Sequence, residues 1–385
     1  MANETEVATG VTEESVREAL STVQDPEINR PITDLGMVKS VQLAGATVRV
    51  AVYLTVSGCP MRETITDRVK TAVGRIPGVT AVEVELDVMS DEQRKELSQL
   101  LRGGAPEREI PFAKPGTLTR VYAVASGKGG VGKSSVTVNL AAALAAQGQK
   151  VAVVDADIYG HSVPRMLGVE GRPTQVQDMI MPPSAHGVKV ISIGMFTPGN
   201  APVVWRGPML HRALQQFLAD VYWGDLDVLL LDLPPGTGDI AISVAQLVPN
   251  AEILIVTTPQ QAAAEVAERA GTIALQTHQK IVGVIENMSG MPCPHCDELV
   301  DVFGTGGGKT VADALTRATG ATVPVLGSIP IDVRLREGGD DGTPVVLAAP
   351  DSPAGTALRA VADKLGNRQR GLSGLSLGLT PKNKF

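Results

Sequence analysis

The spacing of apolar residues divides the first hundred residues into helices and strands. Residues 13–23 carry apolar side chains at helical spacing, and Thr12 just before them is suited to cap a helix. In residues 48–54 every second side chain is Val or Leu, which is the period of a half-buried strand. Residues 64–76 predict a second helix, residues 79–88 a second strand and residues 91–101 a charged helix. We therefore expect a small α+β domain over residues 1–102.

From residue 119 the pattern changes to short apolar runs separated by stretches that include alanine-rich helices. The expected strands are residues 121–125, 151–154, 228–231, 253–256, 281–285 and 325–329. Such alternation predicts an α/β domain with a doubly wound parallel sheet, whose ligands lie at the carboxyl ends of the strands. We expect this domain to cover residues 119–366. Residues 103–118, rich in Gly and Pro, then form a linker, and residues 367–385 a flexible tail.

Composition narrows the classes of function. Aromatic residues make up only 3% of the chain, so the core must be built mainly from Val, Ile, Leu and Ala. The net charge of −7 argues against non-specific binding to nucleic acid. No apolar run approaches the roughly 18 residues of a membrane-spanning helix, and residues 1–14 lack the apolar core of a secretory signal. Three cysteines in a large chain fit a reducing compartment. We expect a cytoplasmic protein without nucleic-acid or membrane partners.

The loop after the first strand of the larger domain carries a nucleotide-binding motif. Residues 127–134 satisfy G-x-x-x-x-G-K-[ST], with a strand before them and a helix expected over residues 135–147. Glycines let backbone N–H groups converge on phosphate oxygens, and the helix adds its positive end. We expect Lys133 to neutralise the β- and γ-phosphates of ATP and Ser134 to bind Mg²⁺. The expected nucleotide contacts here are Gly127, Lys128, Gly129, Gly130, Val131, Gly132, Lys133, Ser134 and Ser135.

Residues 304–310 look like a second loop of this kind. The first glycine of the motif would have to fall at Phe303, and no apolar strand leads into the segment. We interpret these residues as a glycine-rich turn.

Carboxylates follow two of the buried strands. Asp155 and Asp157 end the strand at residues 151–154, and Asp232 ends the strand at residues 228–231, so all three face the phosphate loop. We expect Asp232 and Asp155 to support the Mg²⁺ shell and Asp157 to orient the attacking water. The alternative for each is a strand-end cap or a surface ion pair. Residues 233–239, with two prolines and two glycines, are suited to sense the γ-phosphate.

Cys293 and Cys296 form a C-x-x-C pair just after a predicted strand. Two thiolates leave a tetrahedral metal ion half-coordinated. His295 could complete the set, the pair of another chain could do so, or the two thiols could form a redox disulfide.

The second lysine of the phosphate loop, Lys128, resembles the deviant loop K-G-G-x-G-K-[ST] of the MinD/ParA/nitrogenase-iron-protein class of ATPases. The resemblance implies that Lys128 reaches across a dimer to the ATP of the partner, where a cation offsets charge on the transferred phosphoryl group. A homodimer would also bring four thiolates together, enough for a [4Fe–4S] cluster or for Zn²⁺. A solvated Lys128 is the alternative.

The order of the motifs resembles the Mrp/ApbC family of iron–sulfur cluster carrier ATPases over about residues 119–366. The matching segments are residues 127–134, 155–157, 205–209, 232–239 and 287–296. The resemblance implies ATP hydrolysis, with Lys128, Lys133 and Asp157 as catalytic residues, and recognition of adenine by Asn287 with Pro330 and Asp332 nearby. It also implies a homodimer that binds a [4Fe–4S] cluster through Cys293 and Cys296 and transfers it to apo iron–sulfur proteins, with cluster-assembly factors as further partners.

The N-terminal unit resembles the small domain of bacterial Mrp proteins and of SufT-like maturation factors. The matching residues are 25–27, 34–38 and 58–60. Cys59 precedes a predicted helix, whose positive end lowers a thiol pKa, so it could pass a cluster or be a structural thiol. Arg206 belongs to a matching motif, with an ion pair as the only role that we can suggest.

Two other functions compete with the carrier. A spatial or partitioning ATPase of the MinD/ParA type needs an amphipathic helix for membrane attachment, usually C-terminal, or a basic face for DNA. Residues 371–379 hold three glycines and should not form a helix, and the chain is acidic. A targeting ATPase for hydrophobic clients would have a Met-rich groove, whereas the 11 methionines are scattered. The C-x-x-C pair has no function in a partitioning ATPase, whereas a targeting ATPase would use it to hold zinc across the dimer.

Overall fold

The computed structural model describes residues 11–366, apart from residues 27, 29, 56–60, 102–108, 115, 158–159, 178, 197–206, 237–238, 261–273, 294 and 297. The chain divides into two compact units. The smaller unit comprises Met1–Glu107, Gly171–Pro182 and Asp220–Gly224, and the larger comprises Arg108–Glu170, Pro183–Ala219 and Asp225–Phe385. The exact domain boundaries and the linker stay predictions.

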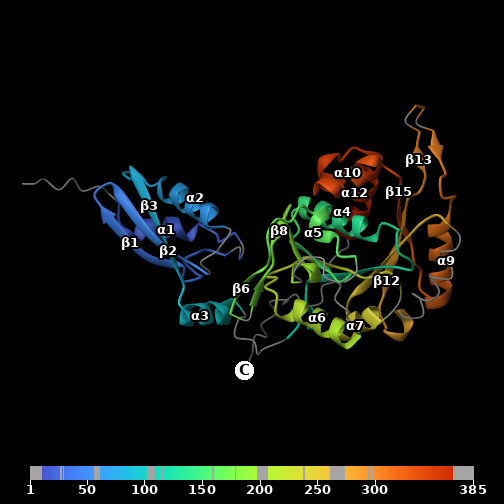
Figure 1. The fold of residues 1–385 in the computed structure, drawn as a ribbon, viewed down its shortest axis with the longest axis horizontal. Helices are drawn as coiled ribbons and strands as arrows, with labels where there is room; N and C mark the ends of the chain where they lie inside the picture. The colour runs from blue at the N-terminus through green and yellow to red at the C-terminus, as the bar shows by residue number, and fades with distance from the viewer. Residues whose placement is uncertain are drawn as a thin grey trace, which may run out of the picture. The chain divides into compact units, whose positions relative to one another are not determined.

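The smaller unit is a three-stranded sheet covered by helices (Figure 1). Its elements are α1 (Glu13–Ser21), β1 (Val38–Ala44), β2 (Thr47–Leu54), α2 (Arg62–Val73), β3 (Ala81–Val88) and α3 (Asp91–Leu101). The central β2 pairs antiparallel with β1 and parallel with β3. Thr12 caps α1 as predicted, since its side chain accepts a hydrogen bond from Ser15 N. The short strands β6 (Thr174–Val176) and β7 (Met179–Met181) also contribute buried side chains to this core.

The larger unit contains an eight-stranded sheet in the order β15-β12-β11-β4-β10-β5-β9-β8. All neighbours run parallel except β8 and β9. This confirms the predicted parallel sheet, with each expected strand at its place. The strands are β4 (Arg120–Ser126), β5 (Val151–Asp155), β8 (Ser184–Ala185), β9 (Val188–Ser192), β10 (Val228–Asp232), β11 (Glu252–Thr257), β12 (Ile281–Asn287) and β15 (Val325–Ile329).

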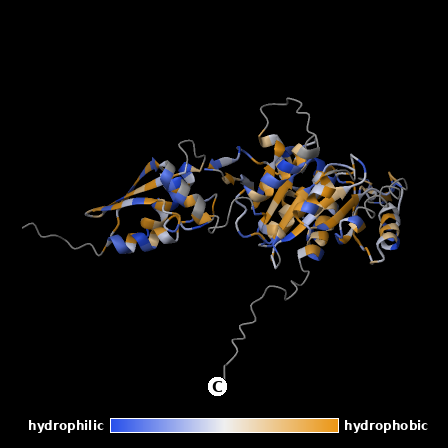
Figure 2. Cartoon of the chain, turned by 90° about the horizontal axis from the view of Figure 1, so that it is seen from below, coloured by the Kyte–Doolittle hydropathy of each residue, from blue (hydrophilic) through white to orange (hydrophobic). Residues whose placement is uncertain are grey.

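Helices cover both faces of this sheet, as expected for a doubly wound fold. Leu254 and Val256 of β11 pack in the core shared with α4 and α12, whereas Ile253 and Ile255 pack in the core shared with α9. Figure 2 shows the apolar strands between helices with polar outer surfaces. The main helices are α4 (Lys133–Ala146), α6 (Gly207–Ala219), α7 (Asp239–Leu247), α9 (Gly307–Thr319), α10 (Val333–Asp341) and α12 (Pro353–Gly366). Shorter elements are α5 (Val163–Met166), α11 (Val345–Ala348), the 3-10 turns Pro111–Ala113 and Ile193–Met195, and the hairpin of β13 (Met291–Pro292) and β14 (Leu299–Val300).

The order of the strands reverses beside β4. The chain adds β5, β9 and β10 on one side of β4, then β11, β12 and β15 on the other. At such a reversal the loops after neighbouring strands separate and leave a crevice at the carboxyl edge. Among the described helices, none is long and apolar enough to cross a bilayer.

Candidate nucleotide site and cysteine pair

The phosphate loop has the predicted strand–loop–helix geometry. It follows β4 and leads into α4, which begins at Lys133. Gly132 caps α4 in the left-handed region with a φ of 79°, and Gly130 has a φ of 77°. Glycine adopts this backbone without steric cost, and a tight turn of this kind is what lets a phosphate loop present its N–H groups to a ligand.

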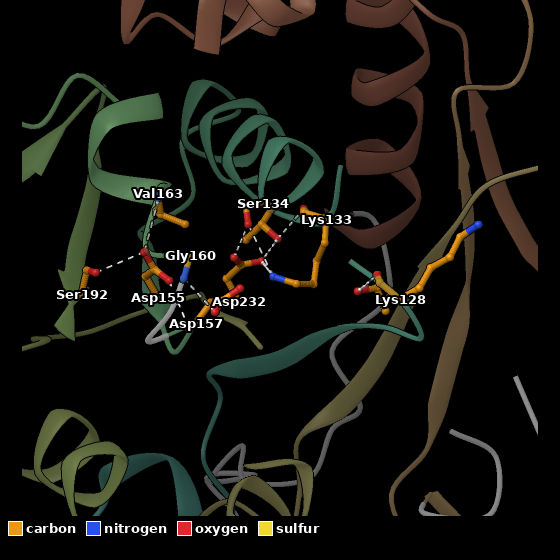
Figure 3. A network of polar contacts seen from close by, with 11 residues as sticks. Lys128, Lys133, Ser134, Asp155, Asp157, Gly160, Val163, Ser192 and Asp232 are labelled. Carbon is orange, nitrogen blue, oxygen red and sulfur yellow. Dashed lines mark hydrogen bonds and ion pairs between the residues drawn. The ribbon is translucent and has the colours of Figure 1, made fainter. Parts of the chain in front are cut away.

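Lys133 lies in a buried polar network with Asp232 (Figure 3). Its Nζ is 2.8 Å from Asp232 Oδ1, and only 6% and 1% of the two side chains are exposed. Asp232 also accepts hydrogen bonds from Ser134 Oγ at 2.6 Å and from Thr137 Oγ1 at 2.8 Å. A buried carboxylate with three such partners is held in one orientation. Asp232 therefore orients both predicted phosphate-loop side chains.

Asp155 lies next to Asp232 because β5 and β10 pair in parallel with these residues in register. Its carboxylate accepts hydrogen bonds from Ser192 Oγ at 3.1 Å and from Asp157 N at 3.2 Å. Burial, followed by repulsion from Asp232, raises the pKa of Asp155 to about 8, against the opposing effect of these hydrogen bonds and of Lys133. The carboxyl groups of Asp155 and Asp232 are thus buried side by side, and Lys133 offsets the negative charge of both.

This donor set fits Mg²⁺. Ser134, Asp232 and Asp155 supply hard oxygen atoms, which are the ligands that Mg²⁺ takes, directly or through water. A cation here would also favour the ionised form of Asp155, which burial otherwise disfavours. The residues present therefore match the predicted metal shell.

Asp157 is the third predicted carboxylate of this edge. It is 9% exposed, and its Oδ1 accepts a hydrogen bond from Gly160 N at 3.1 Å. The backbone N–H of Asp157 donates a hydrogen bond to the Asp155 carboxylate, so residues 155–157 at the end of β5 are held as one turn (Figure 3). Its role with the attacking water stays a prediction.

Lys128 extends away from the Lys133–Asp232 pair (Figure 3). Its Nζ donates a hydrogen bond to Oε1 of Gln260, which follows β11. Lys128 therefore does not join the nucleotide site of its own chain in this structure, although it belongs to the same loop as Lys133.

The end of β12 contacts the phosphate loop through Asn287. Asn287 Nδ2 donates a hydrogen bond to the Val131 carbonyl at 2.9 Å, and a Cβ at Gly132 would collide with the same amide. Glu286, which precedes it, is 5% exposed and binds the N-terminus of α9. We did not single out Glu286 from the sequence, although a lone acidic residue within the apolar strand is a visible signal.

Pro330 and Asp332 lie near the segment that follows Asn287. Ser289 N donates to the Ile329 carbonyl at 2.9 Å, and Ile331 N donates to the Gly290 carbonyl at 2.7 Å. The Asp332 carboxylate caps α10 through Arg334 N, and its side chain pairs with Arg334. Burial opposes ionisation of Asp332, but the hydrogen bonds from Arg334 outweigh it and lower its pKa. Asp332 thus has a local structural function, and its predicted contact with the nucleotide is untested.

The cysteine pair lies on the small hairpin of β13 and β14. Cys293 N donates to the Glu298 carbonyl at 2.9 Å, and Met291 and Pro292 pair with Val300 and Leu299. Cys293 is partly exposed and Cys296 is exposed, and neither forms a disulfide. Among the described residues, no group of three or more His, Cys, Asp or Glu side chains is placed to hold a metal ion. Within the described part of the chain, the hairpin therefore offers two thiols, and no third side chain of these types is placed to bind a metal with them.

Some predicted residues lie outside the described part of the chain. They are Cys59, Arg206 and the end of the γ-phosphate-sensing loop at residues 237–238. The described start of that loop contacts the end of β4, just before the phosphate loop, since Gly236 N donates to the Ser126 carbonyl at 2.8 Å.

Comparison with known proteins agrees with this geometry. Residues 117–366 match a family model described as NUBPL iron-transfer P-loop NTPase, and residues 13–86 match one described as iron-sulfur cluster assembly protein. An iron-sulfur cluster carrier protein of Mycobacterium tuberculosis is 65% identical over 371 residues, which cover 96% of this chain and 97% of the relative. One from Synechocystis is 40% identical over 364 residues, covering 93% and 98%.

A solved structure supports the same assignment. It is a nucleotide-binding protein from Archaeoglobus fulgidus in complex with ADP, 36% identical with a TM-score of 0.50, and the match covers 66% of this chain and 91% of that one. The family predicted from the order of the motifs is thus confirmed. The chain belongs to the NUBPL-type iron-transfer P-loop NTPases, the family of the iron–sulfur cluster carriers.

Proposed function

We propose that this protein is an ATP-dependent carrier that binds an iron–sulfur cluster between two copies of the chain and transfers it to apo iron–sulfur proteins. The observation that carries the proposal is the exposed hairpin of Cys293 and Cys296 on a P-loop NTPase domain. Two thiols that no third described His, Cys, Asp or Glu joins in a metal site fit a cargo that is shared with a second copy and later released.

The nucleotide is proposed to be ATP with Mg²⁺. When ATP binds, the ammonium group of Lys133 would leave Asp232 and bind the β- and γ-phosphates. A phosphate oxygen accepts the same kind of charge-assisted hydrogen bond as the carboxylate does. Ser134 and Asp232 would then hold Mg²⁺, with Asp155 in its outer shell. Asn287 already contacts the phosphate loop and would reach the adenine with Pro330 and Asp332 beside it.

Hydrolysis is proposed to need the dimer. Lys128 lies outside the nucleotide site of its own chain. There a phosphate of the partner's ATP could accept the hydrogen bond that Lys128 Nζ now donates to Gln260. A cation supplied across the interface offsets charge on the transferred phosphoryl group. Asp157, held beside Asp155, would orient the attacking water.

The cargo is proposed to be a [4Fe–4S] cluster bound by two Cys293–Cys296 pairs. Four thiolates complete the ligand set of such a cluster. Apo iron–sulfur proteins and cluster-assembly factors are the proposed partners. Two neighbouring, partly or fully exposed cysteines that form no disulfide fit a reducing compartment, and we propose the cytoplasm.

Iron and labile sulfide analysis tests this function. Protein reconstituted without oxygen should hold iron and sulfide in equal amounts, and both should disappear together in the double variant Cys293→Ala/Cys296→Ala. Cys59→Ala is the matched control for loss of a thiol elsewhere. A wild-type protein that binds zinc but no sulfide would contradict the proposal.

A further inference from the structure

The last two residues of β12 connect the two sides of the sheet. Ile285 packs in the core shared with α4, and Val284 packs in the core shared with α9. Because strand side chains alternate between faces, Glu286 points toward α9 and Asn287 toward the phosphate loop. Their hydrogen bonds agree, since Asn287 binds Val131 and Glu286 binds Gly308.

Glu286 is held by two partners. Its Oε2 accepts a hydrogen bond from Gly308 N at 2.5 Å, and its Oε1 accepts one from Ser289 Oγ at 2.8 Å. Gly308 lies in the first turn of α9, where free N–H groups and the helix dipole stabilise a negative charge. A carboxylate is therefore the side chain that this position suits best.

The glycine-rich segment before α9 serves this contact. A Cβ at Gly308 would lie 2.8 Å from Glu286 Cβ, and one at Gly307 would collide with the backbone of Thr258 and Pro259. The segment is the start of a helix, rather than only the turn that we expected. The N–H of Gly308 binds a carboxylate of the protein itself, in place of the phosphate that a phosphate loop would bind.

The same strand end leads directly to the cysteine hairpin. Ser289, which binds Glu286, is two residues before Met291, where β13 begins. Met288 and Gly290 both have positive φ, at 60° and 85°, so the chain turns sharply here. Movement of the β12 end therefore has a short covalent path to Cys293.

We propose that Glu286 is a positioning residue that couples the phosphate loop to the cysteine pair. It holds the β12 end against α9 while Asn287 holds the same end against Val131, so a shift of the loop when nucleotide binds is passed through Ser289 to the hairpin. The inference rests on the proposed function, because it takes the nucleotide and the thiols of that function as its two ends.

Alkylation of the thiols measures this coupling without a cluster. Full-length apoprotein is pulsed with iodoacetamide in the absence of oxygen, with and without ADP and Mg²⁺, and labelling of Cys293 and Cys296 is quantified by peptide mass spectrometry. Cys59 is the internal reference. In the wild type, nucleotide should change the labelling rate of the pair by about fivefold or more, the lower range of coupling between sites.

The variant Glu286→Gln should bind ADP as the wild type does but lose the nucleotide effect on labelling. The amide keeps the shape but not the charge that binds the start of α9. Ser289→Ala, which removes one of the two hydrogen bonds, should reduce the effect, and this variant carries the test if Glu286→Gln fails to fold. Glu298→Gln removes an exposed charge from the hairpin itself and should preserve the effect.

Two results would overturn the inference. One is an unchanged nucleotide effect in both Glu286→Gln and Ser289→Ala. The other is a wild-type protein that binds ADP but labels at the same rate with and without it. Iron and sulfide content is measured separately, so failure of this coupling is distinguishable from failure of the carrier function.

Discussion

At the scale of single residues, Asp232 organises the nucleotide site. It binds Lys133, Ser134 and Thr137 from α4, although it comes from a strand about a hundred positions later in the sequence. In the pair of Asp232 with Lys133, two buried charges offset each other. The lysine is thus held in place by a carboxylate of the protein itself.

The variant Lys133→Ala should abolish binding of nucleotide, because it removes the cation that neutralises the phosphates and leaves Asp232 buried without its ion pair. Fluorescence titration with a labelled ATP analogue measures the loss. Lys309→Ala is the matched control, since Lys309 lies in the look-alike segment and pairs with the exposed Asp313. Equal loss in both variants would contradict the assignment of the loop.

The pH dependence of stability should report on Asp155. Its pKa of about 8 in the folded protein lies above the ordinary value of 3.8, so between these values the folded state keeps a proton that the unfolded state releases. The stabilisation from this proton is complete at low pH and is lost as the pH rises toward 8.

Urea unfolding of nucleotide-free, metal-free protein, repeated at several pH values between about 5 and about 8, measures this effect. The free energy of unfolding of the wild type should fall relative to Asp155→Asn by up to about 1.4 kcal/mol per pH unit. Parallel curves for the two proteins would show that Asp155 is ionised throughout.

At the scale of elements, the junction of the phosphate loop with β12 determines which glycines are essential. Gly130 and Gly132 have nearly the same φ, but a Cβ at Gly130 meets no atom within 4 Å, whereas one at Gly132 collides with Asn287. Gly130 and Gly132 therefore both need a left-handed backbone, but only Gly132 is closely packed against another side chain.

Gly132→Ala should therefore destabilise the protein clearly more than Gly130→Ala. Each carries the cost of a left-handed residue, about 1–2 kcal/mol, and only Gly132→Ala adds the steric clash. Thermal unfolding without nucleotide compares them. Equal midpoints would show that Asn287 does not press against this loop.

The sequence predicted the elements whose pattern is local and strong. The six parallel strands were found because each is a short apolar run, and the phosphate loop because its residue types are set by phosphate chemistry. The strand β1 was missed, since its side chains are partly buried or exposed and show no alternation. The strands from β6 to β9 were also missed, since most are two or three residues long.

Contacts between distant segments could not be predicted in this way. The pairing of Glu286 with Gly308 and that of Lys128 with Gln260 depend on how strands are ordered in the sheet, and no spacing in the sequence encodes them. The neighbouring positions of Asp155 and Asp232 could be expected only as strand ends of one sheet. Their register, and hence the raised pKa of Asp155, needed the structure.

At the scale of the whole molecule, the proposal requires two copies of the chain. The lysine that faces away from its own site and the thiol pair without a third described ligand both fit a second copy. The variant Lys128→Ala should bind ATP normally but hydrolyse it about 10³-fold more slowly, as for loss of a cation supplied in trans. Gln260→Ala, which removes the partner of Lys128 within the chain, should retain hydrolysis.

Mixing tests the trans contribution in a steady-state ATPase assay. Lys133→Ala cannot bind nucleotide but retains Lys128, so adding it to Lys128→Ala should restore part of the lost hydrolysis. No restoration, or full activity of Lys128→Ala alone, would remove the argument for a lysine in trans.

The shared cluster is the central claim, and native mass spectrometry of protein reconstituted without oxygen tests it most directly. The predicted species has the mass of two chains plus one [4Fe–4S] cluster, and it should revert to cluster-free chains in the Cys293→Ala/Cys296→Ala variant. A single chain that carries the cluster alone, or a dimer whose added mass is that of zinc, would contradict the account.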